Sequence, residues 1–133
     1  MTTSLAPTQT PPAHRVVPAL VNGQQIFIEC RSWCSMDHVA ENVRQLADAY
    51  HSSDFADLLI RSGSGKPELL LSARIGLDPY SPDPARLVPF VVIDDGSDCA
   101  DLTPQQAEEF ADSLVAFAAK VRDLAVTASK AVT

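Results

Sequence analysis

The chain has 133 residues and a mass of 14.3 kDa, which fits one domain of ordinary size and excludes a large multi-site enzyme. Hydrophobic residues make up 46% and no apolar run approaches the ~20 residues that span a bilayer, so a membrane protein and a fully disordered chain are also excluded. The formal net charge is −7 without a basic stripe, so we expect no binding to nucleic acid or anionic membranes, and instead a protein partner or a cation.

The N-terminal residues differ in composition from the rest of the chain. Residues 1–14 are rich in threonine and proline, and Leu5 is their one large aliphatic residue. The start lacks the basic and apolar regions of a signal peptide, and three cysteines are too few for a secreted disulfide scaffold. We therefore expect a disordered tail over residues 1–14, a single domain over residues 15–130, and a cytoplasmic location where thiols stay reduced.

A β-hairpin is predicted at the start of the domain. Apolar residues dominate positions 16–21 and 24–30, and Asn22-Gly23 joins the two runs. Asn-Gly supplies the two positive-φ positions of a type I′ turn, whose twist matches the flanking strands. Since proline lacks a backbone N–H, Pro18 either places the first strand at a sheet edge or shortens it.

A short helix is predicted over residues 39–50. Its apolar residues fall on one helical face: Val39, Val43, Leu46 and Tyr50. Asp37 is a suitable N-cap for this helix.

Further strands are predicted in the middle of the chain. Residues 54–60 and 68–76 indicate a second hairpin around a turn at 61–67. Residues 77–86 contain three prolines and are expected to form an exposed loop. Residues 87–93 are the most β-prone run and predict a central strand.

A long C-terminal helix is predicted from Pro104 to about Ser129. Thr103 suits the N-cap, and Gln106 closes a capping box with it. At 1.5 Å per residue the helix would be roughly 39 Å long, whereas strands of ordinary length span about 20 Å.

These elements predict an α+β fold: an antiparallel sheet of four to five strands, one short helix, and a long C-terminal helix packed on the sheet. Because the helix is longer than the strands, we expect a second subunit to cover its far end in a homodimer. The residues of this expected dimer contact are Val121, Leu124 and Ala128.

One group of residues has the chemistry of a metal site. Cys30, Cys34 and His38 have the spacing Cys-x3-Cys-x3-His, and His51 follows thirteen residues later. Thiolate and imidazole are ligands that Zn²⁺ prefers, with four of them in a tetrahedron where the site is structural. The pattern therefore predicts a zinc site at these four residues.

The predicted helix constrains this site. An unbroken helix over residues 39–50 would hold His38 and His51 nearly 20 Å apart, at about 1.5 Å per residue. Both histidines could not then bind one ion. Either the helix is broken or shortened, or the fourth ligand is Asp37, Cys99 or water.

Two other interpretations of the cysteines stay open. Cys30 and Cys34 could be ordinary buried thiols beside a packed Trp33. Alternatively, one of them is a reactive thiol with His38 or His51 as its base, in a thiol-based enzyme or redox protein. Trp33 itself is interpreted as a core anchor, with a binding platform as the alternative.

Acidic residues crowd one turn, where Asp94, Asp95 and Asp98 lie close in sequence. They indicate a solvated turn, a weak cation site or, together with Trp33, a partner-binding surface. The favoured function is a non-enzymatic, acidic interaction or regulatory protein stabilised by zinc. The alternatives are the thiol-based protein and an acidic nucleic-acid mimic that occupies a basic partner.

Several segments resemble a family of small actinobacterial proteins, of the Streptomyces type, that have no established activity. The resemblance covers about residues 25–130 and is carried by the runs 30–38, 48–52, 78–81 and 102–107. The core pattern C-x-x-W-C-x-x-x-H of this family corresponds to Cys30, Trp33, Cys34 and His38. Many members have proline after the first cysteine, where this chain has Arg31.

Overall fold

The computed structural model describes residues 14–63 and 65–131. These residues fall into two compact units. Unit 1 runs to Asp54 and includes Ile75–Val88, and unit 2 consists of Phe55–Arg74 and the chain from Pro89 onward. The disordered tail predicted over residues 1–14 lies outside the described residues except for His14, and the single domain over residues 15–130 stays a prediction.

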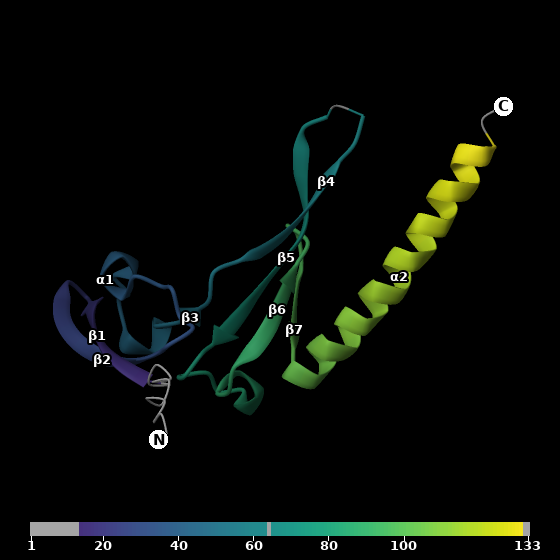
Figure 1. The fold of residues 1–133 in the computed structure, drawn as a ribbon. Helices are drawn as coiled ribbons and strands as arrows, with labels where there is room; N and C mark the ends of the chain where they lie inside the picture. The colour runs from purple at the N-terminus through teal and green to yellow at the C-terminus, as the bar shows by residue number, and fades with distance from the viewer. Residues whose placement is uncertain (1–13, 64, 132–133) are drawn as a thin grey trace, which may run out of the picture. The chain divides into compact units, whose positions relative to one another are not determined.

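The predicted α+β fold is confirmed (Figure 1). Five antiparallel strands pair in the order β3-β5-β6-β7, with β4 also pairing to β5, while β1 and β2 form a separate two-stranded sheet. The strands are β1 (His14–Val21), β2 (Gln24–Arg31), β3 (His51–Ser52), β4 (Ala56–Arg61), β5 (Pro67–Leu77), β6 (Phe90–Asp94) and β7 (Cys99–Leu102). The helices are α1 (His38–Glu41) and α2 (Pro104–Lys130), with short 3-10 turns at Leu46–Asp48 and Pro84–Arg86.

The first hairpin of unit 1 is confirmed. β1 pairs antiparallel with β2, and Val21 lies opposite Gln24, which leaves a two-residue turn. Asn22 and Gly23 have φ angles of 50° and 75°, as a type I′ turn requires.

The helix predicted over residues 39–50 is wrong beyond Glu41. Asp37 caps α1 as predicted, but Asn42 adopts a left-handed conformation with a φ of 42° and ends the helix after one turn. The next residue, Val43, bridges to Val21 of β1, and its carbonyl accepts a hydrogen bond from Asn22. A short helix with β-branched residues is marginal by itself, so this long-range pairing prevails.

Unit 2 contains the second hairpin and the long helix. The pairing of β4 with β5 confirms the hairpin, with a shift in register between Leu58 and Leu59. β6 lies between β5 and β7 as the predicted central strand, and it begins at Phe90. α2 contacts β6 and β7. None of the helices in the described part of the chain has both the length and the apolar character needed to cross a membrane.

The buried residues are few, and most of them lie in unit 1. In unit 1 they are Ala19, Cys30, Cys34, His38, Ala49, His51, Ser52, Gly76 and Leu77, and in unit 2 they are Phe90 and Val92. The two cysteines and two histidines singled out in the sequence therefore form much of the interior of unit 1.

The N-terminus of α2 provides a test of the fold. The Thr103 hydroxyl accepts a hydrogen bond from the Gln106 N–H at 3.1 Å, and the Gln106 side chain accepts one from the Thr103 N–H at 2.9 Å. Thr103→Ala should lower the free energy of unfolding by about 0.5–2 kcal/mol, because it leaves a helix N–H without its partner. Urea unfolding followed by circular dichroism measures this, and Thr103→Ser, which keeps the hydroxyl, should stay close to the parent. Equal losses in both variants would contradict the capping role.

Candidate metal centre

Four side chains from different parts of unit 1 converge in its interior. Cys30 lies near the end of β2, Cys34 in the loop that follows, His38 at the first position of α1, and His51 in β3. Each offers one ligand atom, and these atoms all lie within 4.8 Å of one another. All four residues are buried. The arrangement could hold a metal ion.

Backbone contacts explain why these residues meet. The N–H of Cys34 donates to the Arg31 carbonyl at 3.1 Å, which turns the chain back after β2. The N–H of Ser35 donates to the Ser52 carbonyl at 2.9 Å and joins this loop to β3. Asp37 then accepts hydrogen bonds from the first N–H groups of α1, which fixes the start of the helix at His38.

Three of the distances between donor atoms fit a tetrahedral site. Cys30 Sγ lies 3.6 Å from His38 Nε2 and 3.7 Å from His51 Nδ1, and Cys34 Sγ lies 3.8 Å from His38 Nε2. Zn–S bonds of about 2.3 Å and Zn–N bonds of about 2.0 Å at a tetrahedral angle place sulfur and nitrogen about 3.5 Å apart. The two imidazole rings meet edge to face, with centroids 4.9 Å apart, so both can direct a nitrogen toward one point.

The early end of α1 allows His51 to join this group. After Glu41 the chain is no longer helical, so the separation of nearly 20 Å expected for an unbroken helix does not arise. Asp37, one of the alternative fourth ligands, instead uses its carboxylate to cap α1. Cys99, the other side-chain alternative, is exposed and belongs to unit 2.

Glu41 is a member of the site that the sequence analysis missed. Its Oε2 lies 2.9 Å from His38 Nδ1, three residues earlier on α1. A carboxylate that accepts a hydrogen bond from one ring nitrogen fixes the tautomer and leaves the other nitrogen free to bind a metal. The i,i+3 spacing of His38 and Glu41 on a capped helix was the signal that could have found it.

Burial sets the protonation of the cluster. It raises the pKa of the Cys30 thiol above its ordinary value of 9.0, and the neighbouring Cys34 adds to this, while Arg15 opposes it. Burial also lowers the pKa of His51 to about 4, with the charges of His38 and Arg31 adding to the effect. At neutral pH His51 is therefore uncharged, which is the form that binds a metal.

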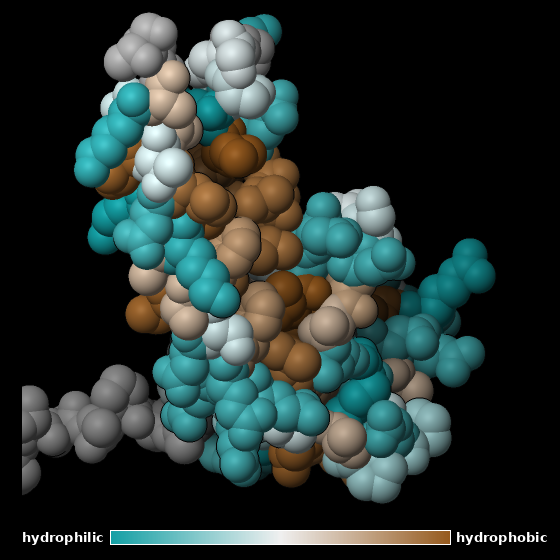
Figure 2. Space-filling model, turned by 90° about the vertical axis from the view of Figure 1, so that its right-hand side faces the viewer, coloured by the Kyte–Doolittle hydropathy of each residue, from teal (hydrophilic) through white to brown (hydrophobic). Residues whose placement is uncertain are grey.

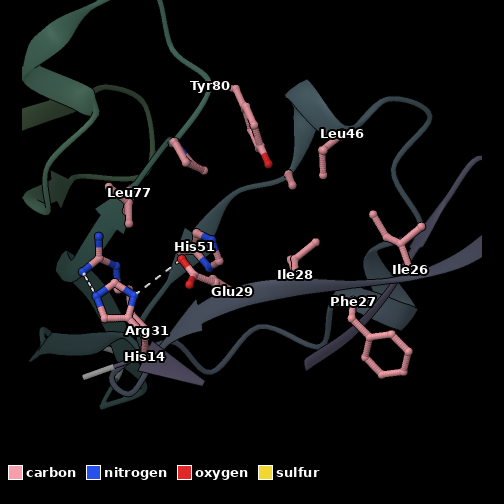
Figure 3. Close-up of a pocket in the computed structure, with 12 residues that line it drawn as sticks. His14, Ile26, Phe27, Ile28, Glu29, Arg31, Leu46, His51, Leu77 and Tyr80 are labelled. Atoms are coloured by element: carbon pink, nitrogen blue, oxygen red, sulfur yellow. Dashed lines mark hydrogen bonds and ion pairs between the residues drawn. The ribbon is translucent and has the colours of Figure 1, made fainter. Parts of the chain in front are cut away.

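His51 also lines a cavity of about 380 Å³ in unit 1, shown in Figure 3. Tyr80 directs its hydroxyl into this cavity (Figure 3). At the wall of the cavity, Arg31 Nη1 lies 2.8 Å from His14 Nε2 and holds that ring in place. His51 thus stands between the cluster and the cavity.

The remaining sequence candidates have structural surroundings of their own. Trp33 is half-buried. The Asp94 carboxylate accepts a hydrogen bond from Gly96, and the Asp95 carboxylate accepts two, from Ser97 and Asp98. These bonds lower the pKa of Asp95 and stabilise the turn between β6 and β7. A role of Trp33 or of these aspartates in binding a partner stays a prediction.

The fold and the cluster define the class: a small α+β protein with a buried group of two cysteines and two histidines that could hold a metal ion. The chain belongs to the DUF6907 family, described as a domain of unknown function, which matches residues 8–130. No match was found among curated proteins or among solved structures. The actinobacterial origin suggested by the resemblance stays a prediction.

Replacing one cluster thiol should abolish metal binding. Protein purified with Zn²⁺ is expected to contain about one ion per chain, and Cys34→Ser should lose it, because a serine hydroxyl is a poor zinc ligand beside thiolates. Cys99→Ser removes an exposed cysteine of unit 2 and should keep the full metal content. Elemental analysis after gel filtration measures both. Zinc retained in Cys34→Ser, or lost in Cys99→Ser, would contradict this assignment of the ligands.

Metal uptake at pH 7 should release protons from the thiols. The Cys30 thiol, with its raised pKa, is protonated in the metal-free protein and must lose its proton to bind. His51, with a pKa of about 4, is already neutral at pH 7 and releases no proton when it binds a metal. Metal affinity should therefore fall as the pH is lowered and rise as it is raised toward the pKa of the thiol. Calorimetry in two buffers of different ionisation enthalpy measures the release, and identical enthalpies in both buffers would contradict it.

Proposed function

We propose that Cys30, Cys34, His38 and His51 bind one Zn²⁺ as a closed structural site, and that the protein is a non-enzymatic, acidic interaction protein. The observation that carries this proposal is the convergence of two sulfur and two nitrogen donors within 4.8 Å in the interior of unit 1. Two thiolates and two imidazoles form a donor set typical of structural zinc sites.

The composition of the interior supports a structural role for the metal. Apart from the cluster, the buried hydrophobic residues of unit 1 are Ala19, Ala49 and Leu77, which is a small core. Small domains with little buried apolar surface commonly need a metal or disulfides to fold. Four protein ligands also leave no open position for a substrate.

The burial of the thiols argues against a reactive cysteine. The exposed fractions are 1% for Cys30 and 3% for Cys34, and burial raises the pKa of Cys30. Reactive cysteines are partly exposed and have lowered pKa values. A reducing, cytoplasmic location, as expected from the sequence, would keep both thiols available for the metal.

The acidic mimic is less well supported. Asp94 and Asp95 use their carboxylates to accept hydrogen bonds within their own turn, so the turn explains their presence. We therefore infer that the net charge of −7 keeps the protein soluble and disfavours the binding of acidic partners.

Chelation tests the proposed function directly. The chain has one tryptophan, Trp33, which lies between the two cluster cysteines in sequence and reports on unit 1. Removing the metal with a strong chelator should shift Trp33 emission to the red as unit 1 unfolds, and added Zn²⁺ should reverse the shift. The helical circular dichroism signal, which comes mainly from α2 in unit 2, serves as the internal control and should largely persist. Unchanged Trp33 emission and unchanged thermal stability after complete metal removal would refute the structural role.

A further inference from the structure

The C-terminal helix of unit 2 has an apolar stripe with the spacing of a coiled coil. The stripe consists of Phe110, Leu114, Phe117, Val121, Leu124 and Ala128. Successive members alternate between four and three residues apart, which is a repeat of 3.5 residues sustained along the helix. Such a stripe can form the seam along which one helix packs against another.

Unit 2 covers only the beginning of this stripe. Phe110 and Leu114 line an apolar cavity of about 280 Å³, together with residues of β4, β5 and β6. Every residue of α2 from position 115 to 130 is exposed. The exposed fraction is 62% for Phe117 and 69% for Leu124, values that are unusual for large apolar side chains aligned on one helix.

The β4–β5 hairpin of the same unit is also left uncovered. Leu58 and Leu71, which lie opposite each other in the hairpin, line the cavity beside α2. Leu69, which pairs with Leu59 beyond the shift in register, is half exposed. Figure 2 shows hydrophobic residues gathered in a band in its upper half, on the side of the molecule that carries α2. The hairpin and the helix together form an apolar groove that is open to solvent.

We propose that a second copy of this chain fills the groove, with the two α2 helices packed antiparallel along their stripes. The charges of the helix favour this partner and this direction. The first turns carry Glu108, Glu109 and Asp112. The turns from position 120 onward have a net positive charge, because three basic residues outnumber one acidic residue: Lys120, Arg122 and Lys130 against Asp123. An antiparallel pair sets the acidic start of each helix beside the basic end of the other, whereas a parallel pair would set like charges side by side.

The side chains of the stripe complement one another in this arrangement. With Phe117 placed opposite Val121 of the second copy, Leu114 meets Leu124 and Phe110 meets Ala128. Each large residue at the start of the stripe then faces an equal or smaller residue near the end, as close packing requires. The contact is self-complementary and closes as a dimer with two-fold symmetry. It lies entirely in unit 2 and does not depend on the proposed metal site.

The mass of the full chain in solution tests the proposal. Light scattering after gel filtration of the metal-loaded protein should give twice 14.3 kDa. Leu124→Glu should raise the dissociation constant of the dimer at least about 100-fold, because two-fold symmetry places the buried charge in the contact twice. Val126→Glu is the matched control, since Val126 is an exposed apolar residue of α2 outside the stripe, and this variant should remain dimeric. A monomeric parent, or equal loss of dimer in both variants at unchanged helix content, would overturn the proposal.

Cross-linking tests the direction of the helices. In a Cys99→Ser background, Leu114→Cys and Leu124→Cys are prepared as separate proteins, mixed and oxidised. Antiparallel packing predicts disulfides between the two variants, resolved by mass spectrometry, and little linkage within either one. Disulfides that form mainly within each variant would show a parallel pair and overturn the antiparallel arrangement.

Discussion

Two sulfur atoms and two imidazole nitrogens lie at the centre of unit 1, where a domain of this size would ordinarily have a hydrophobic core. A fully buried aliphatic side chain contributes about 1.5–3 kcal/mol, and Leu77 is the one large aliphatic residue buried among the described residues of this unit. A structural zinc ion contributes about 10–16 kcal/mol of binding free energy at neutral pH. On these magnitudes the metal, if bound as we propose, is the main stabilising interaction of unit 1.

The local structure around the cluster brings its four side chains together. Asp37 fixes the start of α1, and Asn42 ends it one turn later, so that the chain can return to His51 in β3. Glu41 orients the His38 ring from the same short helix. Unit 2 differs from unit 1 in its apolar residues. Large apolar side chains of α2 and of the β4–β5 hairpin are exposed, and the strands of the unit do not cover them. Unit 1 has little hydrophobic core, and the proposed zinc site would stabilise it. Unit 2 has exposed apolar side chains, and the proposed dimer would bury them.

Sequence reasoning predicted the elements whose signals are local. Asn22-Gly23 specified the first turn, and Thr103 with Gln106 specified the start of α2, because each involves residues adjacent in the chain. The spacing of cysteines and histidines also singled out the four residues that meet. The end of α1 could not be predicted in this way, since it depends on Val43 pairing with Val21, which is distant in sequence. Glu41 could have been found from the sequence, since Asp37 was predicted as the N-cap and Glu41 lies three residues after His38 on the capped helix.

X-ray absorption at the zinc edge of the metal-loaded protein tests the proposed site, because it reports the atoms bound to the metal without any mutation. We expect a four-coordinate ion with two sulfur ligands at about 2.3 Å and two nitrogen ligands at about 2.0 Å. A spectrum without sulfur in the coordination sphere, or with six oxygen and nitrogen ligands, would contradict it.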